Sequence, residues 1–175
     1  IEKIYSEVVA FSNSSDQYDD FTMLVADFKG IIKGRHNYAI ELPAAIESVP
    51  SLRDFILEKC QRHGMAGRDL EDILLVADEA ATNIVIHAYA GLSAIAPVFY
   101  CDMEIETGQK VRLQFRDNGR SFRMEDVKHP DLSENLAGKR KGGFGVYLIR
   151  SLMDLVSYYR KDEQNYLVTE KLLNR

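Results

Sequence analysis

The sequence predicts an α+β fold in which a layer of helices lies on a mixed, mostly antiparallel β-sheet. Strand-like segments follow one another at residues 98–106 and 110–116, and again at residues 156–160 and 166–172. Helical periodicity is concentrated in the stretches before and between these strand pairs. Strands that follow strands, with helices grouped between them, indicate a helix layer packed on a sheet.

The first part of this domain is expected to contain one strand and two helices. Residues 38–42 have the composition of a strand. Pro43 is expected to start a helical region that runs to residue 63, because proline is favoured in the first helical turn and Gly64 can cap the end. The clearest helical periodicity covers residues 70–90.

The second part is expected to contain the paired strands, a long irregular segment, a helix and the two closing strands. Asp117 ends the second strand of the first pair. Residues 118–143 contain glycine, proline and charged residues without sustained periodicity, and a structureless segment of this length is usually functional. Residues 144–155 resume a helical pattern.

Composition limits the class of partner. Of the 175 residues, 46% are hydrophobic and 28% are charged, which suits a packed core with a solvated surface. The net charge of -5 argues against a nucleic-acid or anionic-membrane footprint, because both need clustered positive charge. Cys60 and Cys101 lie far apart, outside any disulfide or metal-binding pattern, and no apolar run approaches the roughly 20 residues that span a bilayer. We therefore expect a cytoplasmic protein that binds proteins and small anions, with no direct contact to nucleic acid or membrane.

The helix expected at residues 70–90 has one apolar and one polar face. The apolar face consists of Ile73, Ala77, Ala80, Ile84 and Ala88. On the polar face, Glu79 and Asn83 lie one turn apart, with Thr82 beside them and His87 a further turn along. Such a pair suits a magnesium ion that bridges phosphates, with Asn83 as the ligand and Glu79 placed to polarise an attacking hydroxyl. Taken alone, the spacing is explained better by a solvated helix face, and His87 by itself is a weaker signal still.

An aspartate stands where the strand at residues 110–116 stops. Asp117 is followed by Asn118 and Gly119, so the chain can turn tightly there. A carboxylate at this place can accept a hydrogen bond from the exocyclic amine of adenine, and Gly119 would let the backbone approach the ring. Taken alone, a hairpin-type turn is the better explanation of Asp-Asn-Gly.

A glycine-rich segment opens the helix expected at residues 144–155. In Gly142-Gly143-Phe144-Gly145 the free backbone N–H groups and the positive helix end face whatever precedes them, which is an arrangement suited to phosphate. The preceding Lys-Arg-Lys run at residues 139–141 could add positive charge, although such a run is more often solvated. A single glycine-rich turn is weak support for a phosphate site.

Together, these three segments resemble the sequence boxes of one ATPase family. EAATN on a helix, DNG after a strand and GGFG before the next helix resemble the N, G1 and G2 boxes of the GHKL ATPases. The longer strings DEAATNIVIHAYA, DNGRSF and GGFGVYLIRSLMD resemble the anti-sigma-factor serine/threonine protein kinases of that family. The resemblance covers residues 37–173 and implies a Bergerat-type fold that closes a lid, here residues 122–141, over ATP.

The same resemblance implies ATP and Mg2+ as cofactors and assigns roles to six residues. Many family members have a second glycine in the G1 box where this chain has Ser121, a departure that bears on the lid hinge and removes no ligand. The expected roles are Glu79 as general base, Asn83 as Mg2+ ligand, Asp117 as adenine acceptor, Gly119 in the base pocket, and Gly143 and Gly145 in the phosphate loop.

Residues 1–29 resemble a different family. The string QYDDFTMLV resembles the end of a PPM-type metal-dependent serine/threonine phosphatase domain, where an acidic pair precedes the last strand. In that family the first acid of the pair helps to bind a catalytic divalent metal, and Asp19 matches it. The other metal-binding carboxylates are not in this chain, so we expect a turn without metal. The expected division is therefore a phosphatase remnant at residues 1–29 and a kinase domain at residues 30–175.

The function implied by the resemblance is that of an ATP-dependent serine/threonine protein kinase. Its substrate would be an anti-sigma-factor antagonist, it would inhibit a sigma factor by binding it, and it could form a homodimer. The alternative is a nucleotide-dependent binding switch that transfers phosphate poorly, but such a module has no need for a base at Glu79. A sensor histidine kinase is less favoured, because no phospho-acceptor histidine helix precedes the ATPase region.

Overall fold

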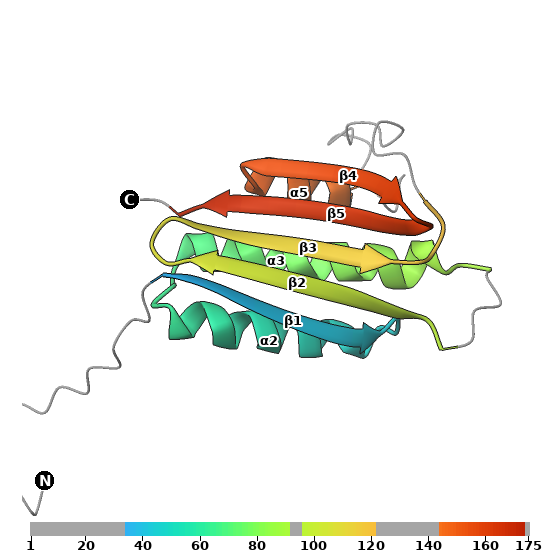
Figure 1. Cartoon of the computed structure of the whole chain (residues 1–175), viewed down its shortest axis with the longest axis horizontal. Coiled ribbons are helices and arrows are strands. Elements are labelled where there is room, and N and C mark those ends of the chain that lie inside the picture. The colour runs from blue at the N-terminus through green and yellow to red at the C-terminus, as the bar shows by residue number, and fades with distance from the viewer. Residues whose placement is uncertain (1–33, 92–95, 122–143, 174–175) are drawn as a thin grey trace, which may run out of the picture. The chain divides into compact units, whose positions relative to one another are not determined.

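Five strands form one sheet in the order β1-β2-β3-β5-β4 within the described part of the chain (Figure 1). The computed structural model describes residues 34–91, 96–121 and 144–173. Every strand pairing in this part is antiparallel. The strands are β1 (Arg35–Pro43), β2 (Val98–Glu106), β3 (Lys110–Asp117), β4 (Leu155–Lys161) and β5 (Gln164–Leu172). Because β5 lies between β3 and β4, the end of β3 is a direct neighbour of the start of β5.

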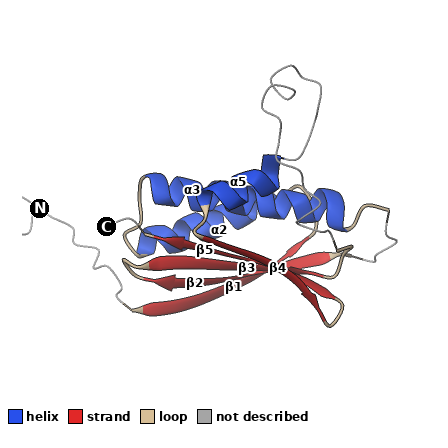
Figure 2. Ribbon diagram, turned by 90° about the horizontal axis from the view of Figure 1, so that it is seen from above, coloured by secondary structure: helices blue, strands red, loops and turns tan. Residues whose placement is uncertain are grey.

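The helices cover one face of this sheet (Figure 2). They are α2 (Ser48–Arg62), α3 (Arg68–Asn83) and α5 (Phe144–Leu152), and α3 packs against both of the others. The single helix expected over residues 70–90 is in fact two pieces, because α3 passes into a π-helical turn, η1 (Ile84–Ala88). Such turns are rare and often lie at functional sites.

The core lies between the helices and the covered face of the sheet. Side chains alternate along β2 and β3, so that every second residue is buried beneath the helices. The predicted apolar face of α3 packs on them, with Ile73, Ala77, Ala80 and Ile84 buried. The inward residues of the two strands are Phe99, Cys101, Met103 and Ile105 on β2, and Val111, Leu113, Phe115 and Asp117 on β3. The last inward position of β3 is thus occupied by a carboxylate.

A largely buried ion pair holds α3 and α5 over the sheet. Lys171 of β5 donates through Nζ to the Asp72 carboxylate of α3 at 2.8 Å and to the Leu152 carbonyl of α5 at 2.8 Å. Only 12% of the Lys171 side chain and 14% of the Asp72 side chain are exposed. Because solvent screens such a pair less than a surface pair, it contributes to holding the two helices side by side.

The predicted α+β class is confirmed, and three details of the expectation are wrong. The described sheet is wholly antiparallel rather than mixed. Pro43 ends β1 instead of starting a helix, which an edge strand tolerates, and α2 begins only at Ser48. The helix expected to reach residue 155 ends at Leu152, because Leu155 already pairs with β5 as the first residue of β4.

Some expectations fall outside the described residues. These are the phosphatase-like segment at residues 1–29 with Asp19, the lid at residues 122–141, and Gly143 of the phosphate loop. In the ranges that are described, no helix combines the length and the apolar character required to cross a membrane.

Candidate active site

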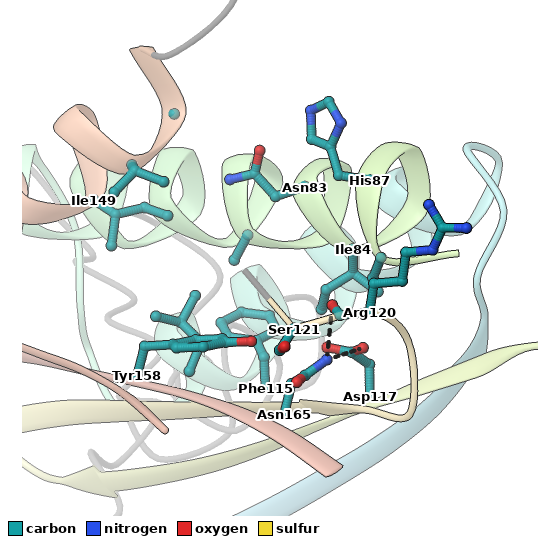
Figure 3. Close-up of a pocket in the computed structure, with 15 residues that line it drawn as sticks. Asn83, Ile84, His87, Phe115, Asp117, Arg120, Ser121, Ile149, Tyr158 and Asn165 are labelled. Carbon is teal, nitrogen blue, oxygen red and sulfur yellow. Dashed lines mark hydrogen bonds between the residues drawn. The ribbon is translucent and has the colours of Figure 1, made fainter. Parts of the chain in front are cut away.

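A cavity of about 420 Å³ lies between α3 with η1 and the ends of β3 and β5 (Figure 3). Its wall is largely apolar, with contributions from Ile84, Phe115, Ile149 and Leu167. A few polar side chains, among them Asn83, Asp117 and Asn165, face it from three different elements. A concave apolar pocket with a small number of converging polar groups is the usual form of a small-molecule site.

Strand register places Asp117 at the bottom of this cavity. Asp117 follows Phe115 in the period-2 series of inward residues on β3, so its carboxylate points to the helix-covered face. Only 7% of Asp117 is exposed. Its partner across the β3–β5 ladder is Asn165, which is 2% exposed and begins the inward series of β5. The two polar side chains therefore meet below the cavity.

The Asp117 carboxylate is held by donors on one of its two oxygens. Oδ1 accepts hydrogen bonds from the Gly119 N–H at 2.8 Å and from Asn165 Nδ2 at 2.9 Å. Arg160 of β4 donates to Asn165 Oδ1 at 2.8 Å and to the Gly119 carbonyl at 3.0 Å. Burial raises the pKa of Asp117, while Asn165, Gly119 and Arg160 act in the opposite direction. Burial is the largest of these influences, so the pKa of Asp117 lies above its ordinary value, and both donors to the carboxylate contact Oδ1 rather than Oδ2.

The turn after Asp117 is fastened to the end of the helix opposite it. The Tyr89 hydroxyl donates to the Val98 carbonyl at 2.8 Å and accepts the Asn118 N–H at 3.1 Å. The Arg120 N–H donates to the Ala88 carbonyl at 2.7 Å. The hairpin explanation of Asp-Asn-Gly is wrong, because β2 and β5 already pair with the two sides of β3 as far as Asp117 and the turn packs against η1.

Gly119 is required by its contact with η1. A Cβ atom at this position would lie 2.5 Å from the Ala88 carbonyl oxygen and 2.7 Å from its carbonyl carbon. Backbone at that distance cannot move aside cheaply, so any side chain would push the turn away from the helix. The glycine lets the turn pack against η1 and so shapes the end of the cavity beside Asp117, which is called the base end below. The expected approach of Gly119 to an adenine ring stays a prediction.

The other end of the cavity brings together Glu79, Asn83 and Gly145. A Cβ atom on Gly145 would lie 2.6 Å from Glu79 Oε2 and 3.2 Å from Asn83 Nδ2. Glu79 and Asn83 project from adjacent turns of α3 towards the first turn of α5. The carboxylate, the carboxamide and the helix start thus share a space that only glycine leaves open.

The residues present at this end fit a magnesium ion that is shared with a nucleotide. No group of three or more His, Cys, Asp or Glu side chains suited to a metal occurs among the described residues. A site with one or two protein oxygens suits Mg2+, which keeps several waters and takes phosphate oxygens as further ligands. The cradle beside Gly145, formed by the Asn83 amide and the Glu79 carboxylate, has this composition.

The predicted site residues that the structure describes lie in or beside one cavity. Asn83, Asp117 and Gly145 line it, and Glu79 lies directly beside Gly145. His87 stands at the mouth and is exposed. Glu79 and Asn83 therefore do not form a merely solvated helix face, because Gly145 of a separate helix lies beside both side chains.

Three residues of the base end were missed by sequence reasoning. Arg160 and Tyr89 had no local pattern to identify them. Asn165 had one, since it precedes Leu167 and Thr169 in a period-2 series whose other members are inward-facing. A strand that begins at residue 164 rather than 166 would have placed a polar side chain on the buried face.

Comparison with known proteins identifies the family. Residues 42–171 match the histidine kinase-like ATPase domain. The serine-protein kinase RsbW of Staphylococcus epidermidis is 35% identical over 126 residues, which cover 70% of this chain and 78% of that protein. RsbW of Staphylococcus aureus strain RF122 / ET3-1 is 33% identical over 128 residues, with the same coverage. The chain belongs to the RsbW family of serine-protein kinases.

Solved structures agree with the RsbW-type fold. The structure of the RsbU and RsbW domains of Rv1364c from Mycobacterium tuberculosis matches 80% of this chain and 33% of that chain, with a TM-score of 0.54 and 17% identity. The SiaB-SiaC complex from Pseudomonas aeruginosa matches 78% of this chain and 89% of that chain, with a TM-score of 0.54 and 10% identity. The predicted membership of the GHKL ATPases, in the anti-sigma-factor kinase branch, is confirmed. The chain is a serine/threonine protein kinase domain that uses ATP.

Proposed function

We propose that this kinase domain transfers the γ-phosphoryl group of ATP to a serine or threonine of an anti-sigma-factor antagonist and inhibits a sigma factor by binding it. The observation that supports the proposal is one cavity with the Asp117 carboxylate at one end and with Asn83 and Gly145 at the other, where Glu79 lies beside Gly145. A nucleotide that lies along the cavity would place its phosphates beside the general base.

At the base end, Asp117 accepts a hydrogen bond from the exocyclic amine of adenine. Its Oδ1 already receives two donors, so Oδ2 is the oxygen offered to the ligand. Apolar side chains such as Ile84 and Phe115 enclose the ring from the sides. A carboxylate that two hydrogen bonds hold in one orientation before the ligand arrives requires little reorganisation to accept the bond.

At the phosphate end, α5 begins at Phe144 with Gly145 in its first turn. Its first backbone N–H groups lack partners within the helix and so face the phosphates, joined in our proposal by Gly143 of the preceding loop. Asn83 would hold Mg2+ together with phosphate oxygens and water. When bound there, the ion neutralises charge on the β- and γ-phosphates.

Glu79 acts as the general base. Its carboxylate accepts the proton of the incoming serine hydroxyl, whose oxygen forms the new bond to phosphorus while ADP leaves with the electrons of the broken bond. Two exposed apolar residues, Leu75 at 39% and Ile86 at 51%, lie on the solvent-facing side of the same helical stretch. They offer a protein substrate an apolar surface next to the base.

The proposal also covers residues 1–29, the oligomeric state and the location of the protein. Residues 1–29 are a remnant of a PPM-type phosphatase domain, and the kinase domain is residues 30–175. The similar fold in the structure of the RsbU and RsbW domains comes from a protein that carries a further domain, and the other similar fold comes from a two-protein complex. A homodimer and a cytoplasmic location belong to the same proposal.

The test is the variant Glu79→Gln, assayed with radiolabelled ATP and purified candidate antagonist proteins. Loss of a general base should lower phosphoryl transfer by about 100-fold or more, while ATP affinity measured by calorimetry stays within a few-fold. Glu71→Gln on the exposed start of α3 is the matched control and should transfer at the parent rate. An unchanged rate in Glu79→Gln would exclude it as the base. No transfer by the parent to any candidate would favour the binding switch.

A further inference from the structure

We infer that Asn165, held in one orientation by Arg160, is a positioning residue that makes the site select adenine over bases with a carbonyl at the same position. The inference rests on the proposed use of Asp117 as the adenine acceptor. It assigns a role to two residues, on β5 and β4, that lie outside the sequence boxes of the kinase.

Asn165 is the centre of the buried network. It is 2% exposed. Its Nδ2 lies 2.9 Å from Asp117 Oδ1 and 3.2 Å from each of the carbonyl oxygens of Gly119 and Arg120. Figure 3 shows Asn165 beside Asp117 and Arg120. Three acceptors thus surround one amide nitrogen, which has two hydrogens to share among them.

The orientation of the Asn165 amide is fixed by its neighbours. Arg160, which has only donors, contacts Asn165 Oδ1 at 2.8 Å. If the amide were turned over, its oxygen would face a carboxylate and two carbonyls, and its nitrogen would face the guanidinium. Every one of these contacts would then be repulsive, so a single orientation is allowed.

The fixed orientation of the Asn165 amide decides which hydrogen-bonding group the cavity presents to a nucleobase. Within the part of the chain that the structure describes, Asn165 and the Gly119 N–H both donate to Oδ1, so Oδ2 is the oxygen that Asp117 presents to a ligand as an acceptor. Adenine brings an amine that can donate to Oδ2. Hypoxanthine brings a carbonyl oxygen at the same place, and two acceptors would then face each other in a buried site, which binding sites reject strongly.

The experiment measures the affinities of ATP and inosine triphosphate, each with Mg2+, for the full chain by calorimetry. The parent should prefer ATP by about 10-fold to 100-fold, the scale of one hydrogen bond to a charged group. Asn165→Leu and Arg160→Met should both lower this ratio, Arg160→Met by about threefold to tenfold. The ratio of the two affinities is the decisive quantity, because a general loss of structure weakens the binding of both nucleotides alike.

Two variants are used so that the test remains decisive if one of them does not fold. Asn165→Leu removes a buried hub, whereas Arg160→Met changes a side chain that is 33% exposed and leaves the hub in place. Arg112→Met, on an exposed position of β3, is the control and should keep the parent ratio. An unchanged ratio in Arg160→Met and in folded Asn165→Leu overturns the inference and leaves the proposed function standing. A parent that binds neither nucleotide overturns both.

Discussion

The two ends of the cavity are built in opposite ways. At the base end, Asp117 accepts hydrogen bonds from the following turn and from β5, while Arg160 of β4 contacts both of these donors' residues and the Ala88 carbonyl of η1 holds the turn. At the phosphate end, Glu79 and Asn83 come from adjacent turns of one helix and lie beside Gly145 of another. No network comparable to that around Asp117 surrounds these two side chains within the described residues.

This difference separates two tasks of the site. In the proposed function, recognition of adenine depends on a carboxylate that is oriented in advance, and the network that orients it is part of the folded core. The proposed phosphoryl transfer instead depends on groups that rearrange around a phosphate and a metal ion. Substitutions at the base end should therefore cost stability, and those at the phosphate end should cost rate.

The largest effect is expected from Gly145→Ala. The new Cβ atom would lie 2.6 Å from Glu79 Oε2, which is the end of a flexible side chain and can move aside. The fold should keep its stability, because alanine favours a helix by about 0.5–1 kcal/mol over glycine. A displaced base should slow transfer by about 100-fold. Transfer rate and thermal unfolding are measured on the same preparation, and a normal rate would show that the cradle beside Gly145 is not used.

A smaller effect, on stability, is expected from Gly119→Ala. Here the new Cβ atom meets the Ala88 backbone, which cannot yield without moving η1. We expect a loss of about 1–3 kcal/mol in the free energy of unfolding, measured by urea denaturation, together with weaker ATP binding. Gly108→Ala is the control, because Gly108 has a left-handed φ of 74° in a turn remote from the cavity and its loss should leave ATP affinity unchanged. Full stability in Gly119→Ala would contradict the tight packing described here.

The smallest effect is expected from Tyr89→Phe. The hydroxyl that joins the Val98 carbonyl to the Asn118 N–H is lost, while the ring remains. Removal of such a bridge should cost about 1 kcal/mol of stability and a few-fold of ATP affinity. Tyr159→Phe, whose ring stacks on Tyr166 at the edge of the sheet, is the control and should change neither quantity. Equal losses in both variants would mean that the turn does not depend on Tyr89.

Much of the fold could be predicted from the sequence because its signals are local. The alternation along β2 and β3 and the apolar face of α3 appear where expected. The π-helical turn η1 could not be predicted, because periodicity cannot distinguish it from a continued α-helix. Pro43 was misassigned for a similar reason, since proline suits both a helix start and an edge strand.

The site was predictable where it belongs to one segment. Glu79 and Asn83 share a helix, and Asp117 ends a strand, so their residue types and spacing carried information. Asn165 and Arg160 act through cross-strand register, which depends on how β5 pairs with β3 and β4. No residue spacing within one segment reports that pairing. The residues that hold a functional group in place were therefore the ones that sequence reasoning missed.

The contacts at the base end join residues that are far apart in the sequence, and this affects how the domain folds. Tyr89 meets Asn118 across 29 positions, Arg160 meets Gly119 across 41, and Asn165 meets Asp117 across 48. Contacts of this range form only after the intervening chain has lost much of its conformational entropy. We therefore expect the base end to be completed late, when β4 and β5 have docked beside β3. A nucleotide bound there, as proposed, would stabilise the whole domain against unfolding rather than one loop.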